Sequence, residues 1–383
     1  MKDKLKSIVD YLKKKKVDYA DIRQLKTLKE NIKVKNKGVE SLSKNENQGF
    51  GIRVIVDGAW GFASSSILTE AEMKKVANQA IQIAKASATT KKEDVVLTET
   101  EPYVDKFTSQ YSIDPFGVPL DKKIELLLDS TEILLKSDKI KVAEGSIAFI
   151  KTDKIFASTE GAFIEQSILQ SGAGISATAV DGSEVQRRSY PTSFGGDFAT
   201  RGYEFVKEMK LYENAEKVRE EALQLLVAEP CPDTTTTIII TGGQMALQVH
   251  ESCGHPTELD RVLGTEISLA GGSFLSLDKK NNLKYGSDKV TITADATIPG
   301  GLGSFGYDDE GVKAQRVYLV KNGLFVGYLT SRETAGVVGE QSNGTMRADG
   351  WNRIPLIRMT NINLEPGEWE FNNLVADTQD GIL

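Results

Sequence analysis

Two histidines and a glutamate stand together in this chain, in a pattern that suits metal chemistry. Residues 250–255 read HESCGH, and they contain the only two histidines among 383 residues. Neutral imidazole nitrogens bind zinc, and a catalytic zinc site usually takes three protein ligands. A glutamate directly after the first histidine can accept a proton from an activated water and pass it to a leaving amine. His250 and His255 are therefore candidate zinc ligands, and Glu251 is the candidate general base of a peptidase.

The spacing of the two histidines tests this interpretation, because it is i, i+5 rather than the familiar i, i+4. In a regular α-helix, residues five apart are separated by about 140° around the axis, which prevents joint ligation. A local widening toward π geometry would bring them within about 50° of each other, and Gly254 tolerates such a distortion. A regular helix therefore predicts that His250, Glu251 and His255 are ordinary helix-end residues, whereas a π-type or unwound turn predicts a metal site.

A strand and a short helix are expected to position this motif. Residues 234–241, TTTTIIIT, form a β-branched run that is typical of a strand. Two glycines interrupt the run, and residues 244–253 are predicted to form a helix that Gly254 and Pro256 end. The motif would then lie at the C-terminal end of a short helix that follows a strand.

The first part of the chain alternates predicted helices and strands. Residues 48–66 are predicted to form two strands joined by a tight turn at Asp57-Gly58. A helix should follow, with Thr69 and Glu72 as a capping-box pair at its start. This order of elements is typical of a mixed helix and sheet domain.

Two more helices and a strand meander follow. Residues 121–136 and 203–228 keep the helical spacing of apolar side chains. Residues 141–180 are predicted to form three short strands, with a turn at Thr152-Asp153 between the first two.

Proline places a predicted domain boundary near residue 229. Pro230 and Pro232 end the preceding helical stretch, because proline cannot continue a helix. The residues that follow are mostly strand-like runs and glycine-rich turns. We therefore predict an α+β fold with two domains: an N-terminal α/β domain over residues 1–228, and a β-rich C-terminal domain over residues 229–383 that carries a short metal-binding helix.

Composition argues against several classes of partner. A formal net charge of −7 gives no broad attraction to phosphate backbones, so no nucleic-acid partner is expected.

No apolar run approaches the roughly 20 residues that span a bilayer. The lysine-rich residues 1–16 have one apolar helical face, which favours a surface helix over membrane binding, and they lack the core of a signal peptide. We expect no membrane partner and a cytoplasmic location, where the two cysteines, Cys231 and Cys253, would stay reduced.

Five ordered segments of the chain resemble the TldD/PmbA family of peptidases. The metal-motif segment is VHESCGHPTELDRVLG, and an earlier segment, GIRVIVDGAWGFAS, resembles the N-terminal signature of the family. The segment FGYDDEG at residues 305–311, followed by Gln315-Arg316 and Tyr328-Leu329, resembles the DDEG segment. Two later segments, RMTN and LEPG, resemble the last signature. The similarity spans almost all of the chain.

The resemblance implies a two-domain subunit, a dimer with itself or with a paralogue around an enclosed cavity, and cleavage of unfolded proteins or peptides. It implies that His250 and His255 are zinc ligands and that Glu251 is the general base. Family members supply a third ligand from a cysteine near the C-terminus, a position that neither Cys231 nor Cys253 matches. We therefore expect a C-terminal domain that is incomplete at its end. Two hypotheses follow: an active zinc peptidase, or a non-catalytic binding or assembly subunit that lacks the third ligand.

Other motifs favour plainer interpretations. Residues 301–306 match GxGxxG, but the acidic residues that follow favour a loop over a dinucleotide site. Asp308, Asp309 and Glu310 are expected to form an exposed acidic turn rather than a hard-metal site or a cavity lining. Cys253 is expected to pack in the core rather than to act as a nucleophile.

Overall fold

A computed structural model describes residues 1–267 and 271–383. Its largest feature is an eight-stranded sheet in the N-terminal part, residues 1–225, with the path β3-β2-β1-β5-β6-β4 and with β7 and β8 also paired to β6. The strands are β1 (Tyr19–Lys35), β2 (Gly38–Val56), β3 (Ala59–Ser65), β4 (Val104–Thr108), β5 (Ile140–Ser158), β6 (Phe163–Asp181), β7 (Glu184–Tyr190) and β8 (Asp197–Ala199). Adjacent strands pair in antiparallel orientation, except for β4 and β6, which are parallel.

Helices pack on one face of this sheet. They are α1 (Lys2–Lys14), α2 (Glu70–Ala88), α3 (Leu120–Leu134), α4 (Tyr203–Glu208) and α5 (Leu211–Leu225), with a short 3-10 turn, η1 (Pro115–Gly117), before α3. One core cluster joins α1 and α2 to β1 and β2, and a second joins α3 and α5 to β5 and β6. Helices α1, α2 and α5 bury apolar stripes, as the spacing of their apolar residues predicts. Helix α3 differs, because it buries Lys123, Ser130 and Thr131 beside Leu127 and Leu134.

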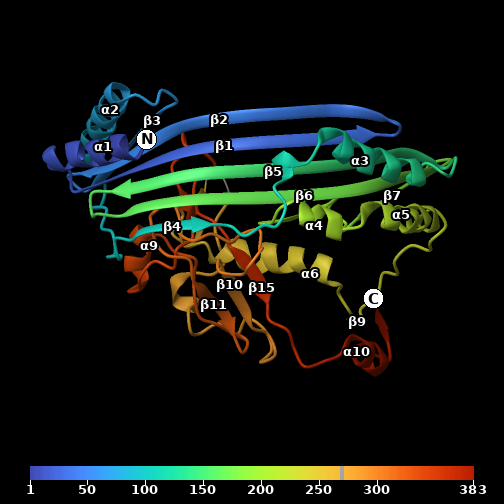
Figure 1. Ribbon diagram of the computed structural model, residues 1–383. Coiled ribbons are helices and arrows are strands. Elements are labelled where there is room, and N and C mark those ends of the chain that lie inside the picture. The colour runs from blue at the N-terminus through green and yellow to red at the C-terminus, as the bar shows by residue number, and fades with distance from the viewer. Residues whose placement is uncertain (268–270) are drawn as a thin grey trace.

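The C-terminal part, residues 237–383, covers the opposite face of the sheet (Figure 1). The two faces can be followed along β1, because successive side chains of a strand point to opposite sides. Ala20 and Ile22 belong to the cluster with α1 and α2. The alternate residues, Asp21 and Arg23, point to the other face. Asp21 forms a buried ion pair there with Arg53, and Arg23 donates to the backbone oxygen of Arg353 in the C-terminal part.

Several local predictions for the N-terminal part are confirmed. The turn between β2 and β3 lies at Asp57-Gly58, where φ is 50° and 68°. At the start of α2, one half of the expected capping box is present: the Thr69 hydroxyl accepts a hydrogen bond from the backbone N–H of Glu72 at 3.3 Å, whereas the Thr69 N–H donates to the oxygen of Ile67. Residues 1–16 contain α1, and its apolar face is buried against the sheet, as predicted. As a separate finding, no helix among the described residues is long and apolar enough to cross a membrane.

Two local predictions for this part are wrong. The turn expected at Thr152-Asp153 does not exist, because β5 continues through it: Thr152 pairs with Thr27 of β1 on one side and with Ile168 of β6 on the other. The helix expected over 203–228 is broken between α4 and α5, because the backbone of Lys210 turns to φ 50°.

The C-terminal part combines short strands and helices. A four-stranded sheet has the order β12-β11-β10-β15, and two pairs, β13-β14 and β9-β16, stand apart from it. The strands are β9 (Thr237–Ile238), β10 (Ile292–Asp295), β11 (Arg316–Lys321), β12 (Leu324–Phe325), β13 (Met346–Arg347), β14 (Leu356–Ile357), β15 (Asn361–Leu364) and β16 (Gly381–Ile382). The helices are α6 (Gly242–Val249), α7 (Leu259–Val262), α9 (Arg332–Ala335) and α10 (Phe371–Asp377), with η2 (His250–Gly254), η3 (His255–Thr257), η4 (Leu277–Lys279) and η5 (Gly336–Val338).

The strand expected over residues 234–241 is wrong for most of its length. Only β9 is paired, and its partner β16 meets it over two residues. A β-branched run needs a neighbouring strand along its whole length to become a strand, and here the remaining residues have none. Residues 228–236 form neither helix nor strand and connect the two parts of the molecule. Residues 301–306 form a loop, and Gly303 donates its N–H to the side chain of Asn361.

The acidic turn expected to be exposed is buried instead. Asp308, Asp309 and Glu310 are only 1%, 4% and 3% exposed. Lys154 of β5 donates to the Asp309 carboxylate at 2.5 Å, and Arg53 of β2 pairs with Glu310 at 3.2 Å. Cations on the sheet face thus pair with two of these carboxylates, which allows the charges to be buried. These cations lie far from the turn in the sequence, so the turn alone gives no sign of them.

Candidate metal centre

The motif lies where helix α6 changes its winding. After Val249 the chain continues directly into η2, a five-residue π-helical turn. The backbone N–H of His255 donates to the oxygen of His250, five residues earlier. The helix carrying the motif therefore has the π-type widening that joint ligation by an i, i+5 pair requires.

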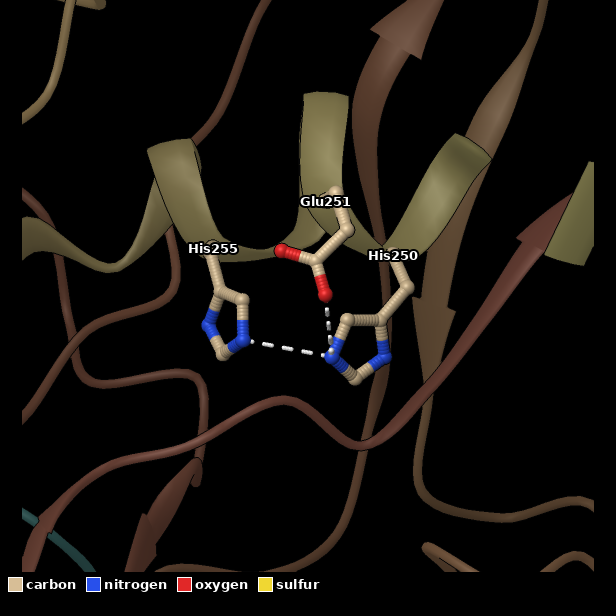
Figure 2. A group of neighbouring side chains, drawn as sticks. All are labelled: His250, Glu251 and His255. Carbon is tan, nitrogen blue, oxygen red and sulfur yellow. Dashed lines mark hydrogen bonds and ion pairs between the residues drawn. The ribbon is translucent and has the colours of Figure 1, made fainter. Parts of the chain in front are cut away.

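This widening turns both imidazoles to one side of the helix, as Figure 2 shows. The Nε2 atoms of His250 and His255 lie 3.2 Å apart. The ring centroids are 4.7 Å apart, and the ring planes are nearly perpendicular, at 89°. With Glu251, the two histidines offer ligand atoms that all lie within 4.8 Å of one another.

The geometry fits a single zinc ion. Two nitrogens bound at 2.0–2.1 Å to a tetrahedral zinc stand about 3.3 Å apart. The observed separation of 3.2 Å therefore matches two ligands of one ion. Among the side chains of residues 1–267 and 271–383, His250, Glu251 and His255 form the one group of at least three histidine, cysteine or acidic residues placed closely enough to hold a metal.

A buried carboxylate orients His255. The Nδ1 atom of His255 lies 3.1 Å from Oε2 of Glu258, a side chain that is 1% exposed. Because a carboxylate only accepts hydrogen bonds, this contact places the proton on Nδ1 and leaves the Nε2 lone pair for a metal. Arg261 Nε donates to the same Oε2 at 2.5 Å, and its Nη2 lies 3.1 Å from the His255 Nδ1. A hydrogen bond from Nη2 would require an Nδ1 without its proton, and the lone pair of that Nδ1 would then face the Glu258 carboxylate oxygen. The Nδ1–H tautomer avoids this repulsion, and Arg261 still pairs with Oε2 through its Nε.

His250 and Glu251 form the open side of the group. Their side chains are 50% and 60% exposed, whereas that of His255 is 19% exposed. Partial burial and the neighbouring His255 lower the pKa of His250 from its usual 6.5, which favours the neutral imidazole that a metal needs. The Glu251 carboxylate lies 3.7 Å from Nε2 of His250. A ligand entering from solvent would therefore meet His250 and Glu251 first.

Neither cysteine joins this group. Cys253 is fully buried in the core of the C-terminal part, as expected, and burial raises the pKa of its thiol to about 12. Cys231 is exposed on the connection between the two parts. Glu258, in contrast, was not recognised from the sequence, although its i+3 spacing from His255 is the signal that could have indicated it.

Family models match three successive stretches of the chain. The PmbA/TldA metallopeptidase domain 1 matches residues 20–84, the central domain matches residues 113–228, and the C-terminal domain matches residues 233–383. The third stretch contains the whole of η2 and its histidine pair.

Relatives with curated names are metalloproteases. A metalloprotease of Methanocaldococcus jannaschii is 32% identical over 367 residues, which are 96% of this chain and 77% of that protein. A metalloprotease TldD homolog of Haemophilus influenzae is 24% identical and covers 99% of this chain and 76% of its own length. A zinc metalloprotease TldD homolog of Saccharolobus solfataricus is 20% identical, over 97% of this chain and 78% of that protein.

Solved structures share the fold. A candidate modulator of a DNA gyrase from Thermotoga maritima superposes with a TM-score of 0.78 at 20% identity, over 97% of this chain and 79% of that one. TldE from Thermococcus kodakarensis superposes with a TM-score of 0.70 at 17% identity, over 99% of this chain and 81% of that one. At this identity, these structures show the fold alone.

Proposed function

The chain belongs to the PmbA/TldD family of metallopeptidases, and from this we propose that it is a zinc-dependent peptidase that cleaves unfolded proteins or peptides. One observation carries the proposal. The Nε2 atoms of His250 and His255 stand 3.2 Å apart on a π-helical turn, at the separation expected of two ligands on one zinc ion. The name of the S. solfataricus relative, a zinc metalloprotease, supports zinc as the metal.

His250 and His255 would hold the ion through their Nε2 atoms, and Glu258 would keep His255 in the required tautomer. When bound, zinc supplies a Lewis acid that polarises a carbonyl and lowers the pKa of a water molecule. The partly buried His255 would fix the position of the ion, and the exposed His250 would complete the pair from the solvent side.

Glu251 would act as the general base. Its carboxylate is exposed and lies next to the histidine pair, where it can accept a proton from the water that attacks the peptide carbonyl carbon. As the C–N bond breaks, Glu251 would return this proton to the leaving amine nitrogen. The hydroxyl group of the water thus ends on the carbonyl carbon of one product and its proton on the amine of the other, and the Glu251 carboxylate is ionised again.

A second candidate function rests on the ligand count. In the described part of the chain, the histidine pair has Glu251 beside it but no cysteine. Two histidines alone hold zinc poorly, because structural and catalytic zinc sites use three or four protein ligands. The chain would then serve as a binding or assembly subunit without activity of its own. Stoichiometric zinc in the purified protein would exclude this alternative.

We also infer that the chain forms a dimer, with itself or with a paralogue. The site has an open side at His250 and Glu251, and a second subunit would supply walls that admit extended peptides and exclude folded proteins. The likeness to TldE, a relative with a different name from the TldD homologs, supports a paralogue as one partner.

Cleavage of an unfolded protein tests the proposal. The purified chain should degrade reduced, unfolded casein in the presence of zinc, and a chelator should stop it. Folded lysozyme, at the same concentration, should stay intact. Failure to cleave casein at any zinc concentration, together with no bound zinc, would contradict the proposed function.

A further inference from the structure

Asp309 connects the N-terminal sheet to the C-terminal part from a buried position. Lys154 Nζ donates to its Oδ1 at 2.5 Å, and Arg23 Nη1 lies 3.4 Å from its Oδ2. Burial alone would raise the pKa of Asp309, but these two cations lower it to about 2. The carboxylate is therefore charged at neutral pH and is held firmly by the sheet.

On its other side, Asp309 holds the residues before and after Arg347. The backbone N–H of Asp309 donates to the oxygen of Met346 at 2.8 Å. The backbone N–H of Ala348 donates to the Asp309 Oδ2 at 2.7 Å. Two hydrogen bonds that flank one residue fix the position of its backbone, so the side chain of Arg347 extends from an anchored point.

Arg347 reaches the residue that packs against the metal-binding turn. Its Nη2 donates to the backbone oxygen of Met359 at 2.6 Å. Met359 is 6% exposed, and its Sδ lies 2.0 Å from the position that a Cβ on Gly254 would take. The thioether therefore occupies the space beside Gly254, the last residue of η2 and the neighbour of His255.

The π turn needs such support. Isolated π turns are rare, and a regular α-helix would rotate the two histidines about 140° apart. Contacts from outside the helix must therefore favour the widened turn. The path from Asp309 through Arg347 and Met359 ends at Gly254, within the turn itself.

We propose that Asp309 is a positioning residue for the metal site: through Arg347 and Met359 it holds η2 in the widened form that lets His250 and His255 share one ion. The inference rests on the zinc site of the proposed function. It assigns to the buried acidic segment a role in metal binding, although Asp309 contacts neither histidine.

Zinc titrations of four variants test this role. Asp309→Asn keeps the shape of the side chain and removes its charge, and Arg347→Met removes the donor to the Met359 oxygen. Glu160→Gln is the matched control, because it weakens a different ion pair between the two parts of the molecule, with both Glu160 oxygens 2.8 Å from Arg332. His250→Ala removes a proposed ligand. The dissociation constant of zinc is measured by calorimetry, and thermal melting without zinc shows whether each variant is folded.

The dissociation constant should rise about 10–100-fold in Asp309→Asn and Arg347→Met, while Glu160→Gln stays within about twofold of the parent and His250→Ala binds no zinc. If Asp309→Asn does not fold, Arg347→Met decides alone. A folded Arg347→Met protein that binds zinc as tightly as the parent would overturn the positioning role. Parent-like zinc binding by His250→Ala would instead overturn the proposed zinc site, so the two failures are distinguishable.

Discussion

The Nε2 atoms of His250 and His255 lie 3.2 Å apart although the two residues are five positions apart on one helix. A regular α-helix cannot bring such a pair together. The π turn η2 does so by inserting one residue into the helical repeat, and its last residue, Gly254, is packed against Met359. The close approach of the two histidines, on which the proposed metal site depends, thus results from one local distortion and from the contacts that stabilise it.

Glu251→Gln should separate metal binding from catalysis. The amide has the shape of the carboxylate but cannot accept the proton of the attacking water, so cleavage of casein should slow by about 10²–10⁴-fold. Zinc content should equal that of the parent, because the two imidazoles are unchanged. A Glu251→Gln protein that retains zinc and cleaves at the parent rate would contradict the assigned role of Glu251.

Glu258→Gln should weaken zinc binding without removing a ligand. The neutral amide accepts the Nδ1–H of His255 less strongly, and the contact of this side chain with Arg261 is no longer an ion pair. The dissociation constant of zinc should rise by about 10–100-fold. Glu340→Gln, which weakens an ion pair with Lys280 on the surface, is the control and should leave it unchanged. Equal zinc affinity in both variants would show that Glu258 does not orient His255.

A methyl group on Gly254 should disturb the site, whereas one on Gly243 should not. In Gly254→Ala the new Cβ would meet the Met359 Sδ at 2.0 Å, so either the thioether or the turn must move, and zinc affinity should fall. In Gly243→Ala, on the same helical segment, nothing lies within 4 Å of the new Cβ. That variant should keep the affinity of the parent and gain roughly 0.5–1 kcal/mol of stability, because alanine favours a helix. Parent-like affinity in Gly254→Ala would show that the close packing is not needed.

Much of the site could be predicted from the sequence because its determinants are local. The i, i+5 spacing of the histidines and the glycine between them indicate a π turn, and the structure has one. The apolar spacing of residues 1–16 likewise predicts which face of α1 is buried. Each of these features depends on neighbours within a few residues.

The features that could not be predicted depend on partners far along the chain. Asp309 is buried because Lys154, 155 residues earlier, comes from β5 to meet it. Thr152 continues a strand because β1 and β6 pair with it on both sides. Residues 234–241 have the composition of a strand, but only β9 within them finds a partner. The local propensity of a segment gives no information about which distant strand or charged side chain will contact it in the folded chain.

The stability contributed by Asp309 should depend on pH. Its pKa in the folded protein is lowered from the usual 3.8 to about 2, so the ionised carboxylate stabilises the fold above that usual value. This contribution should be lost progressively as the pH falls from about 5 to about 2, because the unfolded chain takes up the proton first. Urea unfolding of the parent and of Asp309→Asn should show a difference in the free energy of unfolding that shrinks over this range. A difference that stays constant with pH would contradict the ion pairs assigned to Asp309.

The central claim, that His250 and His255 bind one zinc ion through their Nε2 atoms, can be measured directly because the chain contains no other histidine. Long-range ¹H–¹⁵N spectra of the histidine-labelled protein should show two imidazoles, and His250→Ala assigns the signals. On addition of zinc, both Nε2 resonances should shift together and saturate at one ion per chain, while the Nδ1 of His255 stays protonated. A shift of only one imidazole, or of neither at saturating zinc, would contradict the claim.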